Sequence, residues 1–134
     1  MNPYHLSYEE KKFFDQFSTT LHEVYHILGF SKSLYKYYVD ENLKRKPESA
    51  TYFDKGSGSF QYRIRSPKVL AYAREYYNCP DMDGVPVEDN GGSGSAGSHW
   101  EKITHGNEMM VSNQVANPVV SMFTLKLMED SGWY

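Results

Sequence analysis

FFDQFSTTLHEVYHILGF, residues 13–30, is the stretch that decides how this chain folds. Its apolar residues recur at spacings of one, three and four, which is typical of one face of an α-helix: Phe14, Phe17, Leu21, Val24, Tyr25 and Leu28. Ser7 and Glu10 fit a capping box before it, and Gly29 suits the position just past a helix end. We therefore predict a long amphipathic helix with its apolar stripe in the core. The alternative is a helix that breaks and restarts at residues 18–20.

The same stretch places two histidines four residues apart, with a glutamate after the first. Residues four apart lie on one face of a helix, so His22 and His26 can present ring nitrogens to one metal ion. Glu23 can then hold a metal-bound water and take its proton, which is the chemistry of peptide hydrolysis. The bare H-E-x-x-H pattern also arises by chance, but Gly29 and Phe30 follow as in the metzincin proteases.

A hydrolytic zinc site needs a third protein ligand. Most metzincins have a histidine six residues after the second one, but here that position is Lys32, a cation that cannot ligate zinc. The remaining histidines are His5, His99 and His105, and nothing pairs His5 with the motif. For His105 we expect a surface position or a supporting role beside the ligands. The surroundings of the last two histidines decide between them.

Residues 97–102 read GSHWEK, and residues 108–110 read EMM. These motifs resemble the leishmanolysin family, a branch of the metzincins with a long insertion before the third ligand. In that family the third histidine lies in a G-S-H-W-E context, and the methionine of the turn below the metal follows eleven residues later. That spacing selects Met110 over Met109. The resemblance also covers residues 20–31, 66–78, 89–98 and 125–133, which is most of the chain.

The resemblance implies a zinc metalloendopeptidase with one Zn²⁺ per chain, bound by His22, His26 and His99. Glu23 would be the general base, and Met110 the structural methionine. The resemblance also implies protein or peptide substrates, and residues 111–119 would line a pocket for an apolar side chain. The full-length protein is expected to be extracellular or at the cell surface. The rival hypothesis is a zinc-stabilised binding or adhesion module or an inactive fragment, but a structural zinc site has no use for Glu23 and usually has a fourth protein ligand.

For the fold we predict a mainly helical α+β chain, a zincin/metzincin-like core in one partial domain of residues 1–134, with the N-terminal sheet subdomain largely missing. Residues 60–65 alternate like a strand, and Ser66 and Pro67 suit the N-cap and the first residue of a helix. The Gly-rich loop of residues 79–98 leads to the third ligand. Asn117-Pro118 suits the start of a last helix that ends at Ser131-Gly132. Three residues of this helix are expected to point inward: Met122, Leu125 and Met128.

Composition narrows the function further. A formal charge of −3 and a pI near 5.9 give no reason to expect nucleic acid as a partner. No apolar stretch approaches the roughly 20 residues that span a bilayer, and the N-terminus lacks the pattern of a signal peptide. Cys79 is the single cysteine, so it is expected to be buried or to pair outside this chain. Glu101 and Glu108 are expected either to hydrogen-bond the ligand histidines or to face solvent.

Overall fold

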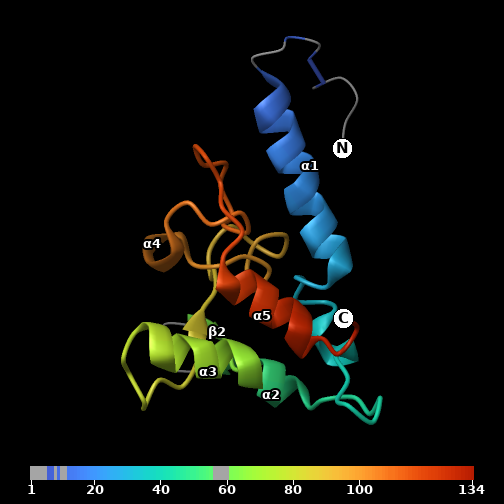
Figure 1. Ribbon diagram of the computed structural model, residues 1–134, viewed down its shortest axis with the longest axis vertical. Coiled ribbons are helices and arrows are strands. Elements are labelled where there is room, and N and C mark those ends of the chain that lie inside the picture. The colour runs from blue at the N-terminus through green and yellow to red at the C-terminus, as the bar shows by residue number, and fades with distance from the viewer. Residues whose placement is uncertain (1–5, 8, 10–11, 56–60) are drawn as a thin grey trace.

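The computed structural model describes residues 6–7, 9, 12–55 and 61–134 (Figure 1). It is a mixed, mainly helical structure with a small antiparallel sheet, as predicted. The elements follow in the order α1 (Phe13–Leu28), the 3₁₀ turn η3 (Tyr35–Tyr37), α2 (Glu48–Thr51), β1 (Tyr52–Lys55), β2 (Gln61–Ile64), α3 (Pro67–Tyr76), β3 (Val85–Pro86), α4 (Lys102–His105) and α5 (Met122–Asp130).

Helix α1 is continuous through residues 18–20, so the predicted restart does not occur. It begins at Phe13, later than the capping box implied, and no side chain caps it. The backbone of Ser7 instead exchanges hydrogen bonds of 2.9 and 2.8 Å with the Gln16 side chain, while Glu10 lies outside the described residues. The helix ends where predicted, because Gly29 has a φ of +146°, which favours glycine.

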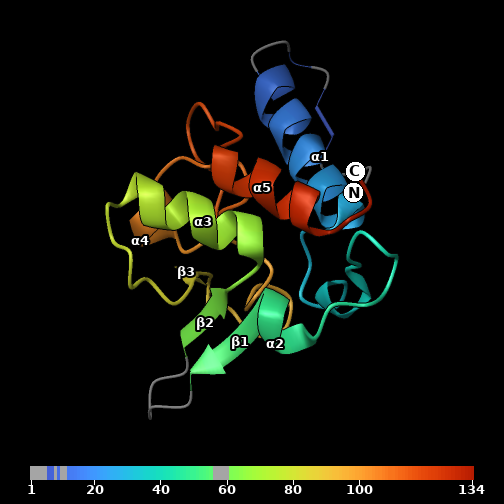
Figure 2. The same cartoon turned by 60° about the horizontal axis from the view of Figure 1, so that its bottom comes forward.

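The prediction that the apolar stripe of α1 is core is wrong for four of its six residues. Among the residues that the structure describes, only Leu21 and Tyr25 of that stripe pack against the buried cluster. The other apolar side chains of the helix are exposed, at 37–78% of their surface: Phe13, Phe14, Phe17, Val24, Ile27 and Leu28. The N-terminal part of α1 extends beyond the other elements (Figures 1 and 2), so no described element covers its stripe there.

The sheet has the strand order β1-β2-β3, with both pairs antiparallel. Ile64 stands opposite Tyr52 on one side and Val85 on the other. The predicted strand is therefore confirmed at residues 61–64, whereas Phe60 lies outside the described residues. The chain then leaves the sheet for the loop that carries His99, and single bridges link Trp100 to Val87 and to Val111.

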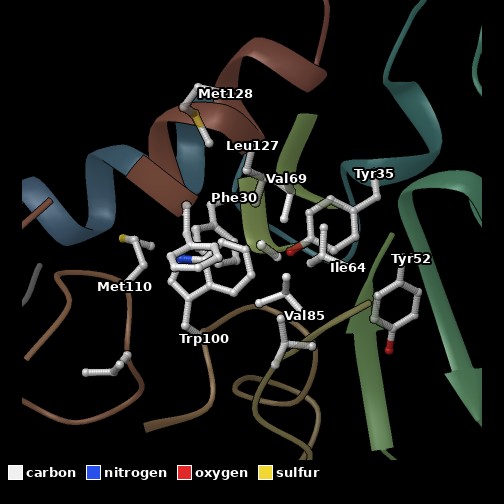
Figure 3. Packing of buried hydrophobic residues seen from close by; sticks show 14 of the residues in the cluster. Phe30, Tyr35, Tyr52, Ile64, Val69, Val85, Trp100, Met110, Leu127 and Met128 are labelled. Atoms are coloured by element: carbon white, nitrogen blue, oxygen red, sulfur yellow. The ribbon is translucent and has the colours of Figure 1, made fainter. Parts of the chain in front are cut away.

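The core gathers around Trp100, which is fully buried (Figure 3). Its ring meets the ring of Phe30, just past α1, with centroids 4.9 Å apart. Side chains from the sheet, α3, α5 and the turn at Met110 complete the cluster, including Ile64, Val69, Val85, Val87, Met110 and Leu127. Because Trp100 follows His99 directly, the core fixes the backbone beside that histidine.

The last helix differs from its prediction. Helix α5 begins at Met122, four residues after Pro118, and ends before Ser131-Gly132 as expected. Met128 is buried, but Met122 and Leu125 are each 41% exposed. A strict spacing of three falls behind the 3.6-residue turn, so the three side chains rotate around the helix. The inward face instead carries Phe123, Thr124, Leu127 and Met128.

A buried carboxylate joins α5 to α3. Pro67 is the first residue of α3, as predicted, but the Ser66 side chain does not cap the helix. The Asp130 carboxylate, 1% exposed, accepts hydrogen bonds from the backbone N–H of Lys68 at 2.9 Å and of Val69 at 3.0 Å. A negative charge at a helix N-terminus is favourable, so Asp130 stabilises α3 from another helix.

We expect Asp130→Asn to lower the free energy of unfolding by about 1–2 kcal/mol, because the charge and one acceptor oxygen are lost from a buried cap. Urea unfolding of the metal-free chain measures this change. Glu129→Gln is the matched control, since Glu129 pairs with Lys68 and Lys126 at the surface. Its loss should cost under about 1 kcal/mol. Equal effects of the two substitutions would contradict the capping role.

Candidate metal centre

Three imidazoles from distant parts of the chain meet at one point. His22 and His26 lie one turn apart in α1, and His99 comes from the loop that follows β3. Their Nε2 atoms form a triangle in which every side measures 3.1 Å. The structure thus brings together the three histidines that the sequence analysis selected.

The opposite nitrogen of each ring contacts a backbone carbonyl. The Nδ1 atoms of His22 and His26 lie 2.7 Å from the carbonyl oxygens of Met109 and Phe30, and that of His99 lies 3.1 Å from Ser95. A carbonyl oxygen only accepts, so each ring carries its proton on Nδ1 and donates it there. Each Nε2 lone pair consequently faces the other two rings.

This donor set fits a zinc ion. Tetrahedral zinc lies about 2.0–2.1 Å from each imidazole nitrogen, which separates the nitrogens by about 3.3–3.4 Å. The observed separations of 3.1 Å are close to that value. Three lone pairs that face one another without a proton between them lack a favourable partner, and a cation supplies one.

The surroundings keep two of the rings in the neutral form that binds metals. Burial, with a smaller contribution from the neighbouring His26 and His22, lowers the pKa of His99 to about 4 against the opposing effect of its hydrogen bond to Ser95. Burial also lowers the pKa of His26 below its ordinary value. Near pH 7 these imidazoles are therefore neutral, and no proton competes for their Nε2 atoms.

The Gly-rich loop passes close to the body of the protein before it reaches His99. Gly97 has a φ of +80°, and a Cβ there would lie 2.9 Å from the Tyr52 hydroxyl oxygen and 3.1 Å from Cδ of Lys32. Its carbonyl accepts a hydrogen bond of 3.0 Å from the Tyr35 hydroxyl. Glycine is thus required at residue 97, which agrees with the expected reason for a Gly-rich approach. Lys32, instead of serving as a ligand, packs its side chain beneath this loop.

Glu23 lies next to His22 on α1 and is exposed. It lines a cavity of about 270 Å³. The other lining residues come from α1 and from the segment after Met109: Ser18, Thr19, His22, Met109, Val111, Ser112, Asn113, Gln114, Val115 and Pro118. Much of the predicted pocket segment, residues 111–119, therefore borders a hollow that opens beside the histidines.

Met110 is fully buried in the turn that follows Glu108. Its backbone carbonyl accepts a hydrogen bond of 2.9 Å from the Trp100 N–H, so this turn lies against the segment that carries His99. Met109, the competing residue, instead uses its carbonyl to bind His22. Whether Met110 serves as the structural methionine of the site stays a prediction.

Two carboxylates behave differently from what was expected. Glu101 caps α4 by accepting from the N–H of Ile103, and Glu108 is buried but binds none of the three imidazoles. Backbone carbonyls hold the rings instead. The sequence carries no signal for these contacts, since every residue has a carbonyl.

The remaining predicted residues lie away from the histidine triangle. His105 stacks on Trp100 with ring centroids 5.0 Å apart, and burial lowers its pKa to about 4. The ring therefore packs against the aromatic core and does not lie free on the surface, and its supporting role beside the ligands stays a prediction. Cys79 is exposed, not buried, in the turn after α3, and its pairing outside this chain stays a prediction. His5 lies outside the described residues.

Comparison with known proteins agrees with this geometry. The family description Leishmanolysin, peptidase M8, matches residues 1–134. The chain belongs to the leishmanolysin family. It is 34% identical over 149 residues to the leishmanolysin-like peptidase of Drosophila melanogaster, covering 87% of this chain and 22% of that protein.

More distant relatives include the ciliated left-right organizer metallopeptidase of Danio rerio and leishmanolysin of Leishmania major. The first is 30% identical and the second 31% identical, each over 90% of this chain. These alignments cover 20% and 19% of the relatives, so the chain spans about a fifth of their length. Among the described residues, no helix has the length and apolar character to cross a membrane.

The partly buried imidazole of His105 leads us to predict a loss of stability in acid. Its pKa is lowered to about 4 in the folded chain and is about 6.5 when unfolded, so the unfolded chain binds more protons between these values. The stabilisation is complete above pH 6.5 and is lost as the pH falls toward 4. Between pH 7 and pH 4.5 this residue should cost about 2 kcal/mol.

His105→Phe keeps an aromatic ring against Trp100 but removes the titration. Urea unfolding of the metal-free chain at both pH values should show a smaller acid loss in this variant, because the other histidines are common to both proteins. Identical acid losses in the two proteins would rule out this contribution of His105.

Proposed function

We propose that this chain carries the zinc-binding part of an endopeptidase, with His22, His26 and His99 as ligands and Glu23 as the general base. One observation carries the proposal: three Nε2 atoms converge within 3.1 Å of one another beside a cavity that Glu23 lines. Membership of a family of metallopeptidases supports it.

Zinc held there would act as a Lewis acid that lowers the pKa of water and polarises a peptide carbonyl. The chain supplies the proton transfer. The Glu23 carboxylate is accessible from the cavity, so it can accept a proton from water and return it to the nitrogen of the departing amine. The carbonyls of Met109, Phe30 and Ser95 keep the three rings aligned throughout, because each Nδ1–H continues to donate its hydrogen bond to its carbonyl.

The cavity is suited to bind an apolar side chain of the substrate. Its lining combines Met109, Val111, Val115 and Pro118 with polar groups, and none of the described lining residues is a lysine or arginine. About 270 Å³ is enough for one large side chain. We assign the cavity to the substrate residue that follows the cleaved bond, since it lies beside the general base.

Glu23→Gln tests the enzyme directly. The amide keeps the size of the side chain but cannot accept the proton, so cleavage of a quenched fluorescent peptide library should fall by about 10²–10⁴-fold. Zinc content, measured by mass spectrometry of the metal-loaded protein, should not change. Zinc bound by both proteins with no cleavage by either would instead favour the zinc-stabilised module.

The same library tests the cavity. Peptides with leucine after the cleaved bond should be hydrolysed about tenfold or more faster than those with alanine, because the larger chain fills an apolar pocket. Val115→Asp should reverse this preference by placing a charge in the cavity wall. No difference between the leucine and alanine peptides would disprove the assignment of the pocket.

A further inference from the structure

Glu108 is a buried carboxylate, 1% exposed, that the chemistry proposed above does not use. One oxygen, Oε1, accepts from the backbone N–H of Ser121 at 3.0 Å, the Ser121 hydroxyl at 3.0 Å and the Thr124 hydroxyl at 2.5 Å. The other oxygen, Oε2, accepts from the backbone N–H of Met110. Donors therefore surround both oxygens.

These donors belong to two separate parts of the fold. Met110 lies in the turn after Glu108 itself, whereas Ser121 and Thr124 lie at the start of α5. Ser121 precedes the first residue of α5, yet its hydroxyl binds Glu108 and does not cap the helix. The carboxylate thus joins the turn at residues 108–111 to the N-terminal end of α5.

That turn contacts two parts of the metal centre: the ring of His22 and the segment that carries His99. Next to Glu108, the carbonyl of Met109 accepts the Nδ1 proton of His22 at 2.7 Å. The carbonyl of Met110 accepts from the Trp100 N–H at 2.9 Å, and the indole N–H of Trp100 binds the Thr124 hydroxyl, also at 2.9 Å. Glu108 therefore binds groups next to the contacts that hold two residues: His22, and Trp100, which follows His99 in the chain.

A carboxylate suits this position better than an amide. Glutamine has one acceptor oxygen and would turn its NH₂ group toward either the Met110 N–H or the donors of α5. Two donors would then face each other inside the protein, which is unfavourable. The negative charge of Glu108 also acts on Tyr25 in α1. Burial is the main cause of the raised pKa of Tyr25, and the Glu108 charge is the second cause.

We propose that Glu108 is a positioning residue for the metal centre: by fixing the turn, it directs the Met109 carbonyl at Nδ1 of His22 and keeps Nε2 of that ring free for the metal. This inference rests on the proposed function, because the His22 ring needs positioning only if it binds a metal. The contact it explains, between His22 and Met109, can be measured without a metal.

Asp130 provides the matched control. It is also a carboxylate of 1% exposure that accepts backbone N–H groups, but it binds the start of α3 and none of the residues that hold the histidines. If Glu108 acts only on stability, Glu108→Gln and Asp130→Asn should behave alike. A positioning role predicts that only the substitution at Glu108 changes the imidazole of His22.

The experiment measures the tautomers of the histidine rings by long-range ¹H–¹⁵N NMR of the metal-free chain at pH 8. In the wild-type chain and in Asp130→Asn, His22 should carry its proton on Nδ1. In Glu108→Gln the ratio of the Nδ1–H to the Nε2–H tautomer of His22 should fall about fivefold, as expected for one weakened hydrogen bond. His26, held by Phe30, should not change and serves as an internal reference.

Zinc affinity, measured by competition with a chelator, should fall about 10–100-fold in Glu108→Gln and stay within about twofold in Asp130→Asn. If Glu108→Gln does not fold, Ser121→Ala removes one donor and should give a smaller change in the same direction. An unchanged His22 tautomer in the folded variant overturns the positioning role. If the wild-type chain binds no zinc but Glu108→Gln still changes the His22 tautomer, only the proposed function is refuted.

Discussion

Three hydrogen bonds from imidazole Nδ1 atoms to backbone carbonyls are the constraint on which the centre depends. Each fixes both the direction of a ring and the nitrogen that carries its proton. The carbonyls belong to Phe30 just past α1, Ser95 in the Gly-rich loop and Met109 in the turn before α5. The centre therefore forms only when a helix end, a loop and a turn have each reached their own conformation.

Local sequence predicted the parts of the structure that local physics controls. The spacing of His22 and His26, the stop at Gly29 and the start of α3 at Pro67 follow from helix geometry and from the special backbones of glycine and proline. Only the motif around His99 indicates this residue as the third ligand. No spacing argument would have brought it to α1 across 73 residues.

The sequence-based predictions fail where tertiary contacts decide the local structure. The stripe of α1 has helical periodicity, but periodicity does not say whether another element covers it. Val119 pairs with Glu108, which keeps residues 117–120 out of α5 despite the start signal at Pro118. Asp130 caps α3 from a distance, so the cap at Ser66 that the sequence suggested is not used.

The separation of His26 and His99 also has a consequence in polymer terms. Contacts between these residues close a ring of 73 residues, which costs about 4 kcal/mol of chain entropy. This cost grows only with the logarithm of ring length, so doubling the ring adds about 0.6 kcal/mol. Most of the entropic penalty for a remote third ligand is already incurred with a short ring. Long insertions between the second and third ligands are therefore thermodynamically inexpensive, provided that a residue such as Gly97 lets the chain return to the helix.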